Sequence, residues 1–377
     1  MLAEARRERA GDGEPAAARP KFGGQPHFQA ELKRRVGQYF EQTGQSPYGG
    51  RRMVVKTAIV LAWFLASYLV LVFVAQTWWQ GLLLSASLAF AMGGIGFSIQ
   101  HDANHGAYSQ RRWVNRLAGL TLDLLGASSY LWQWQHNVFH HTYPNLSGAD
   151  NDIDFLPFAR LSPAQPYYRW HRFQQFYLWI LYGFLYPKWN FIDDFKNVAK
   201  GRIVQSRFPR PRGWRLVEAI AGKLVFFSWA FLVPMLFHRW WIVLAFYATT
   251  AYMLGVLLAV VFQLAHCVED AEFPDVSPVT HRIPRAWAVH QVNTSVDFAQ
   301  TNRVLTWYLG GLNFQIEHHL FPKISHLHYP RLSGIVRAVC AEFGVRYAVH
   351  ENLGAAVSSH WRWLRRMGAP AVVHGAS

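Results

Sequence analysis

The sequence predicts an all-α integral membrane protein with four transmembrane helices arranged in two hairpins. Hydrophobic residues make up 51% of the 377 residues and charged residues only 16%, whereas soluble domains are about 25% charged. Four apolar stretches are long enough to cross about 30 Å of hydrocarbon as helices. The 17 Trp residues are typical of a chain that passes through lipid–water interfaces, where indole rings accumulate. We expect the rest of the chain to form interfacial helices and a cytoplasmic helical cap.

The charge of the chain fits a membrane surface better than a nucleic acid. A net charge of +15 in a soluble protein would raise the question of nucleic-acid binding. Here the basic residues crowd the ends of the apolar stretches, as expected for anionic headgroups and a cytoplasm-facing surface. We therefore expect a lipid partner and no nucleic acid.

Two cysteines, Cys267 and Cys340, are too few for a disulfide framework or a Cys-rich metal cluster. Any metal would have to be bound by histidine. The N-terminal residues are charged from the start and lack a short apolar core, so we expect no removable signal peptide.

The first hairpin follows a polar segment, residues 1–50, which we expect to be a flexible or surface-lying cytoplasmic arm. Residues 53–79 form the first apolar stretch, and Lys56 near its start is expected to snorkel toward water. A turn at residues 77–81 leads to the second stretch, residues 82–99. Because this stretch returns the chain to the arginine-rich side, the next residues should emerge on the cytoplasmic face.

The second hairpin is predicted at residues 216–237 and 241–265. The first of these stretches carries Glu218 and Lys223 in its opening turns. Four arginines precede this hairpin and its far turn has one, so the bias of basic residues toward the cytoplasm predicts the same orientation as for the first hairpin.

Two further apolar stretches, residues 117–134 and 177–186, are too short or too interrupted to span, and we expect interfacial helices there. Residues 268–377 carry no clear span and should form the cytoplasmic cap, with both termini on that face. The predicted division is an arm at residues 1–50, a membrane domain with its cap at 51–345, and a tail at 346–377.

Three clusters rich in histidine lie at the predicted cytoplasmic ends of these elements. A separation of four residues turns a helix by about 400°, so the first two histidines of HNVFHH, like those of HDANH, share a helix face. His141 is offset by about 100° from His140 and should point elsewhere. The clusters, with one histidine at the end of the fourth span, contribute His101, His105, His136, His140, His141, His266, Gln315, His318 and His319.

This set contains more potential ligands than one metal needs. Neutral imidazole suits Zn, Cu, Fe or Ni, so ligand type alone leaves the metal open. A closed structural zinc site takes only four ligands. Eight imidazoles and an amide fit two metals with room for oxygen ligands, which favours a di-iron site that activates O2 for a lipid substrate.

As a set, HDANH, HNVFHH and QIEHH resemble the three histidine boxes of the integral-membrane fatty acid desaturases. The resemblance covers about residues 53–345 and includes HHTYPNLSGADND, FQLAHCVEDAEFP and WYLGGLNFQIEHHLFPKISHLHYPRL. Gln315 in place of the first histidine of the third box resembles the front-end subgroup. The resemblance implies a di-iron enzyme that uses O2 and two electrons to remove two hydrogens from an unactivated acyl chain of an acyl-CoA or acyl-lipid. By position, it implies that the nine residues above are the metal ligands and that the eight histidines are the catalytic residues.

Several neighbouring residues could support such a site. Carboxylates that accept the outer N–H of a liganding imidazole fix its tautomer, although helix capping or ion pairing is an equal alternative for each. His326 and His328 lie outside the boxes and are not expected to bind metal. The expected supporting residues are Asp102, Asn104, Asp150, Asp152, Asp154, Glu317, His290 and Gln291, and the expected substrate-tunnel residues are Trp132 and Trp134.

The electron donor is expected to be a separate protein. Front-end desaturases often carry a fused haem domain with an HPGG signature, and the arm has only His27 and no such motif. A ferredoxin-like or cytochrome partner is implied, and an acidic one would suit the basic face. Two alternatives to desaturation remain: hydroxylation or oxidative decarboxylation of a lipid at the same site, or a membrane haem or metal-transport protein.

Overall fold

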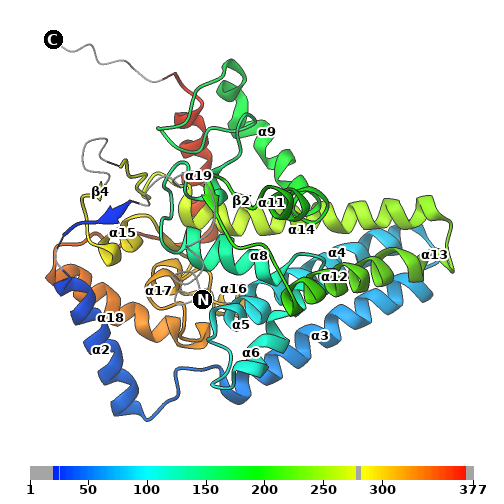
Figure 1. The fold of residues 1–377 in the computed structure, drawn as a ribbon, viewed down its shortest axis with the longest axis horizontal. Coiled ribbons are helices and arrows are strands. Elements are labelled where there is room, and N and C mark those ends of the chain that lie inside the picture. Colours follow the sequence, from blue (N-terminus) through cyan, green and yellow to red (C-terminus); the bar gives the residue numbers. More distant parts are fainter. Residues whose placement is uncertain (1–19, 25, 277–281, 371–377) are drawn as a thin grey trace.

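The computed structural model describes residues 20–24, 26–276 and 282–370. The described chain is mostly helical, with a long helical bundle on one side and a cap of shorter helices on the other (Figure 1). Four helices are long and apolar enough to cross a membrane: Gly50–Phe73, Trp78–His105, Trp214–Met235 and Trp240–His266. The predicted membrane fold is confirmed.

The first hairpin consists of α3 (Gly50–Phe73) and α4 (Trp78–Gly94), and α4 continues through a π-helical segment, η1 (Ile95–Gln100), into α5 (His101–His105). The second helix begins at Trp78, earlier than expected, because Thr77 and Gln80 form a capping box that satisfies free backbone N–H groups. Lys56 does not snorkel. It is only 3% exposed, and its Nζ lies 2.9 Å from His326 Nε2 in the cap.

The second hairpin consists of α12 (Trp214–Phe227), η7 (Ser228–Leu232), α13 (Val233–Met235) and α14 (Trp240–His266). The two charged residues near its start are paired rather than lipid-facing. Glu218 forms an ion pair with Arg116, and Lys223 Nζ lies 2.8 Å from a carboxylate oxygen of Asp194. Because α14 packs against α4, the two hairpins form one bundle whose far turns lie at the same end (Figure 1).

The connection between the hairpins consists of short helices. Residues 117–134, expected as one interfacial helix, are divided because Gly126 adopts φ 88°, a left-handed conformation that ends helices. Residues 177–186 lie within a run of short helical pieces that packs along α14. The elements of this connection are α6 (Arg112–Gly119), α7 (Thr121–Leu124), α8 (Ser129–Trp132), η2 (Gln133–His140), η3 (Asn151–Ile153), η4 (Arg169–Phe173), α9 (Gln174–Leu181), η5 (Tyr182–Phe184), α10 (Leu185–Lys188), η6 (Trp189–Asp193) and α11 (Asp194–Lys200).

The cap is built from elements at both ends of the chain. In the expected flexible arm, the structure has a 17-residue helix, α2 (His27–Thr43), which buries Phe28, Leu32 and Val36 against the cap helices. In the expected tail, α19 (Leu353–Met367) packs against α9 and α14. The other cap helices are α15 (Trp287–Asn293), α16 (Arg303–Tyr308), α17 (Gln315–Leu320), η8 (His326–His328) and α18 (Tyr329–Glu342).

The described chain has three two-stranded pairings, two of which join distant segments. β1 (Lys21–Phe22) pairs with β4 (Arg282–Ile283), β2 (Arg202–Ile203) with β3 (Ser206–Arg207), and β5 (Asp297–Phe298) with β6 (Val349–His350). The first and third pairings are parallel. They connect segments near the two ends of the chain, β1 and β6, to the cap.

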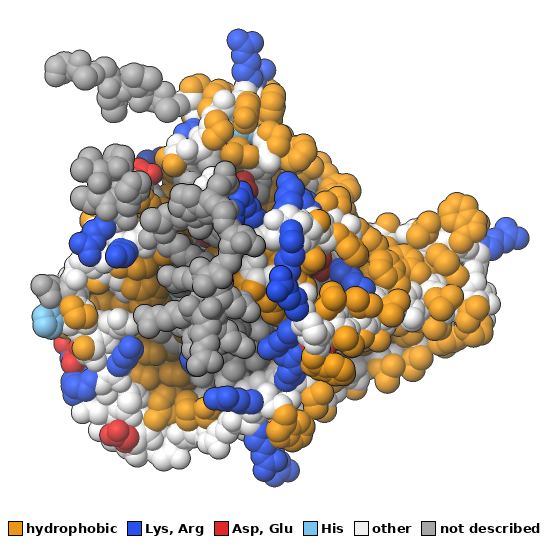
Figure 2. Space-filling model, viewed as in Figure 1, with side chains coloured by type: hydrophobic (Ala, Val, Ile, Leu, Met, Phe, Trp, Pro, Cys, Tyr) orange, Lys and Arg blue, Asp and Glu red, His pale blue; other side chains and the backbone are white. Residues whose placement is uncertain are grey.

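The surface is divided into an apolar region and a basic band, as expected for a protein in a membrane. Hydrophobic side chains cover most of the protruding bundle in Figure 2, whereas Lys and Arg gather in a band where the bundle meets the cap. Lipid would contact the first region, and headgroups would meet the basic band.

Candidate metal centre

The first histidine pair lies at the end of the second transmembrane helix. His101 and His105 are one helical turn apart on α5, with ring centroids separated by 4.8 Å. Gly106, at φ 80°, ends the helix directly after them. Within the described chain, the Nε2 atoms of both residues are buried and lack a hydrogen-bond partner. Two unpartnered imidazole nitrogens are costly in a dry interior unless something binds them.

The second cluster lies on η2, whose π-helical winding changes the expected geometry. The backbone N–H of His141 donates to the carbonyl oxygen of His136, five residues earlier, at 2.9 Å. A turn closed over five residues brings His141 round to the face of His136, and their Nε2 atoms lie 3.2 Å apart. His141 therefore points away from His140, as expected, with the two ring planes at 85°. Its approach to His136 was not expected, because the prediction assumed α-helical winding.

The third cluster lies on α17, which the cap folds against the end of the bundle. Gly310, at φ 59°, packs its backbone on the Phe97 carbonyl of η1, where a Cβ would have no space. This close approach leads the chain into α17, so that His318 and His319 meet the other clusters. His141 Nε2 is 3.0 Å from His318 Nε2.

His266, the last residue of α14, completes the arrangement. Its Nε2 atom lies 3.1 Å from His319 Nε2 and 2.9 Å from the Gln315 amide nitrogen. The amide oxygen of Gln315 is buried without a hydrogen-bond partner among the described residues. Rotation of the amide would present that oxygen to the same point as the two imidazoles.

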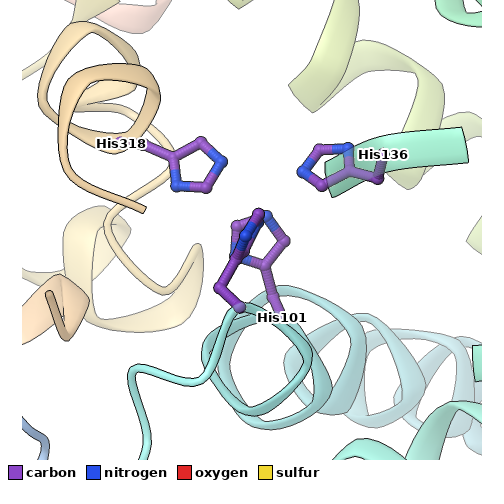
Figure 3. A group of neighbouring side chains, drawn as sticks. His101, His136 and His318 are labelled. Atoms are coloured by element: carbon purple, nitrogen blue, oxygen red, sulfur yellow. The ribbon is translucent and has the colours of Figure 1, made fainter. Parts of the chain in front are cut away.

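The imidazoles fall into two adjoining groups. His101, His136 and His318 point toward one another from three separate elements (Figure 3). Together with His105 they offer ligand atoms within 4.8 Å of one another, and a second group contains His140, His266 and His319. His141 offers a ligand atom within the same distance of those of His318 and His319, where the two groups adjoin. Nitrogens bound at about 2.0–2.1 Å to one ion would themselves be roughly 3 Å apart, as several are here.

The outer nitrogens of the second group are held by acceptors, which leaves each Nε2 free for a metal. His140 Nδ1 is 3.1 Å from an Asp150 oxygen and 3.4 Å from Asp152. His319 Nδ1 is 2.9 Å from the Gln291 amide oxygen. His266 Nδ1 donates to a backbone carbonyl, that of Thr294, at 2.9 Å. Such contacts orient imidazoles for metal binding.

The protonation of the site also suits metal binding. Burial, followed by repulsion between neighbouring imidazoles, holds the pKa values of His136, His141, His318 and His319 well below the usual range. These rings are neutral at pH 7, which is the form that binds metals. Burial lowers the pKa of His140 as well, but the charges of Asp150 and Asp152 outweigh it and raise the pKa to about 9.

Other expected supporting residues have different contacts. Asp102 accepts hydrogen bonds from Ser325 Oγ and His326 Nδ1, both at 2.9 Å. Glu317 Oε1 lies 3.0 Å from the Tyr347 hydroxyl, and the His290 ring packs on that of Phe22.

Asn104 and Asp154 also lie outside the two groups. Asn104 Nδ2 donates to Gln100 Oε1 at 3.0 Å. Asp154 ends the short helix η3. Neither has a described contact with a ligand imidazole.

Two apolar cavities lie within the bundle. A narrow cavity of about 20 Å³ is lined by Gln100, Trp132 and Phe262, among others. A larger one of about 370 Å³ lies toward the far turns. Met92 and Tyr186 line both cavities, so they separate the two spaces.

The two residues expected to line the substrate tunnel lie in different places. The Trp132 ring stacks on His136 with centroids 4.4 Å apart and lines the narrow cavity. Trp134 instead packs with Phe139, Ile203 and Phe208 in a separate apolar cluster.

Some contacts of the site were not expected from sequence. The Tyr329 hydroxyl lies 3.3 Å from His318 Nδ1, and Asn145 connects the second cluster to the end of α14. Asn145 lies in the quoted motif HHTYPNLSGADND, but no rule of spacing singles it out. Tyr329 lies in the motif WYLGGLNFQIEHHLFPKISHLHYPRL, but its contact depends on how the cap folds.

The fold and the site define a class of membrane protein that spans the bilayer four times and gathers its histidines at one end of the bundle, where metal ions could be held. Residues 76–350 match the fatty acid desaturase family model. The chain belongs to the fatty acid desaturase family.

Curated relatives match almost the whole chain. It is 40% identical over 347 residues to an sn-1 linoleoyl-lipid 6-desaturase from Arthrospira platensis, which covers 92% of this chain and 94% of the relative. It is 36% identical to a protein of the same name from Synechocystis sp., over 93% and 98% of the two chains. An acyl-lipid (8-3)-desaturase from Physcomitrium patens is 35% identical, over 90% of this chain and 72% of the relative.

The expected activity is thereby confirmed. The protein is a membrane oxidoreductase, a fatty acid desaturase that acts on fatty acyl lipids. The alternative of a haem or transport protein does not agree with this family.

Proposed function

We propose that this desaturase is a di-iron enzyme that uses O2 to introduce a double bond at carbon 6 of an acyl chain carried by a membrane lipid. The position and the lipid carrier are suggested by the names of two relatives that match over more than nine-tenths of both chains. The observation that carries the proposal is the convergence of imidazole nitrogens beside a narrow apolar cavity. A metal centre in that position meets an acyl chain with little access for water.

Two iron ions would be held by the two adjoining groups of side chains. Among the described residues, the nitrogens of His101 and His105 and the oxygen of Gln315 lack partners, and these atoms and the neutral imidazoles fit this assignment. The first ion would be held by His101, His105, His136, His141 and His318, and the second by His140, His266, His319 and Gln315.

Bound iron supplies the oxidising chemistry, in which O2 leaves as two waters after taking two hydrogen atoms from adjacent acyl carbons, two electrons from a donor and two protons. The chain's own residues position the substrate. Trp132, stacked on His136, and Phe262 form apolar walls of the cavity. Apolar walls exclude water from the reacting carbons and hold the chain extended.

The centre and both termini are proposed to face the cytoplasm. Arg207, Arg210, Arg212 and Arg215 precede the second hairpin, and the basic band lies between the bundle and the cap (Figure 2). Basic residues favour the cytoplasmic side of membranes. The same band would attract an acidic electron donor, ferredoxin-like or cytochrome, to the face that holds the site.

The proposal is tested by gas chromatography with mass spectrometry of lipids from a host that expresses the protein and contains linoleoyl lipids. We expect an acyl product lighter than its precursor by two hydrogen atoms, with the new double bond at carbon 6. The same host carrying His319→Ala should lack it. A product heavier by one oxygen atom would instead identify a hydroxylase, and a double bond elsewhere would overturn the assigned position.

A further inference from the structure

In the second group of ligands, the outer contacts of His140 and His266 both depend on one buried residue, Asn145. Asn145 is fully buried in the turn after η2 and adopts φ 60°. Few residues other than glycine adopt this left-handed conformation without strain, and Asn is one of them. The conformation directs the backbone N–H and the side-chain amide of Asn145 toward different segments.

The backbone of Asn145 acts on His140. Its N–H donates to an oxygen of Asp150 at 2.8 Å. The two oxygens of that carboxylate lie 3.1 and 3.2 Å from His140 Nδ1. The position of the carboxylate, and with it the orientation of the His140 ring, therefore depends on where Asn145 holds its N–H.

The side chain of Asn145 acts on His266. Its Nδ2 lies 2.9 Å from the His266 carbonyl oxygen and 3.3 Å from that of Thr294, and 3.0 Å from that of Glu272. The Thr294 carbonyl also accepts the Nδ1–H of His266 at 2.9 Å. One amide therefore fixes both the end of α14 and the acceptor that orients the His266 ring.

We propose that Asn145 is a positioning residue that holds His140 and His266 together for the second metal ion only. This inference rests on the proposed function, since it assumes two ions. The outer contact described for the first group is of a different kind: His318 Nδ1 faces the Tyr329 hydroxyl. Removal of the Asn145 side-chain amide should therefore weaken the binding of the second ion and leave the first ion bound.

Two substitutions separate the roles of the amide and the backbone. Asn145→Asp is nearly isosteric but presents a carboxylate to three carbonyl oxygens, so acceptors face acceptors in a dry interior. Asn145→Gly keeps the left-handed backbone and the N–H to Asp150 and removes only the side chain. We expect the first substitution to reduce binding of the second ion strongly and the second substitution to reduce it less.

A matched control is Gln174→Glu. Gln174 is also fully buried, and its Nε2 donates to the carbonyls of Arg160 and Leu364 at 2.8 and 2.9 Å. It lies where α9 packs on α19 rather than at the imidazoles. This variant therefore measures the general cost of replacing a buried amide by a carboxylate.

The experiment measures iron per chain by elemental mass spectrometry after full-length protein in detergent is stripped of metal and reloaded with Fe²⁺. We expect two bound ions per chain in the unaltered protein and in Gln174→Glu, and one in Asn145→Asp. In Asn145→Gly, the affinity for the second ion should fall several-fold. Combination of Asn145→Asp with His101→Ala should remove both ions.

Two bound ions of unchanged affinity in both Asn145 variants would overturn the role of Asn145 and leave the proposed function standing. If Asn145→Asp does not fold, Asn145→Gly decides by the same criterion. Fewer than two ions in the unaltered protein would overturn the proposed di-iron function itself, and the inference with it.

Discussion

His140 and His318 illustrate two ways in which a buried imidazole is prepared for metal. His318 lies among other imidazoles, and burial together with their repulsion keeps its pKa low and the ring neutral. His140 lies beside two carboxylates that raise its pKa to about 9. At neutral pH, His140 would have to lose a proton to bind a metal ion, and the two carboxylates would then stabilise the bound cation. The two groups therefore differ in charge as well as in position.

Single substitutions at these two residues test their role. His140→Ala and His318→Ala should each abolish turnover, because each removes one ligand from a different group, while the protein remains in the membrane. Turnover is measured as product per chain, with the amount of membrane protein determined in parallel. His328→Asn is the control, since His328 lies outside both groups. Retained activity in either alanine variant would remove that residue from the ligand set.

At the scale of elements, winding and packing account for what the sequence could not predict. The spacing in HNVFHH placed His136 and His140 on one face, but only the π-helical turn of η2 brings His141 to His136. Lys56 was expected in the interface, yet its partner His326 comes from the cap, 270 residues later. The start of α4 was expected at residue 82 and lies at Trp78, although Thr77 and Gln80 have the spacing of a capping box that signals it.

Two cavities that share lining residues from α4 and α10 predict control over the acyl chain. Met92 and Tyr186 line both cavities, so Met92→Trp should close the passage between them. We expect turnover of long acyl chains to fall at least about tenfold, the effect of roughly 1.4 kcal/mol, with short chains less affected. Leu83→Trp, on the same helix but 64% exposed, is the control. Equal turnover of long chains in both variants would show that the larger cavity does not receive the substrate.

At the scale of the whole molecule, the class of fold and the histidine clusters were predictable because both depend on local sequence. Apolar stretches of sufficient length indicate spans wherever they occur, and the boxes lie where those spans end. The closure of the cap was not predictable. It depends on contacts between ends of the chain, such as the packing of α2 on α18, which buries Leu32 and Val36.

The uneven distribution of charge over the molecule predicts how the electron donor binds. If an acidic donor docks on the basic band, the rate of electron transfer should fall as ionic strength rises, because salt screens exposed charges within about 10 Å at 0.1 M. The measurement is turnover with a purified ferredoxin across a series of salt concentrations, with the substrate held in excess. A rate independent of salt would contradict electrostatic docking.

We propose that nine side chains from three clusters and one helix end hold two iron ions beside the acyl cavity. The most direct test is the metal content of the full-length protein purified from iron-replete cells, measured per chain together with the optical spectrum. We expect two iron ions per chain and no haem absorption. A single metal ion per chain, or haem, would contradict it.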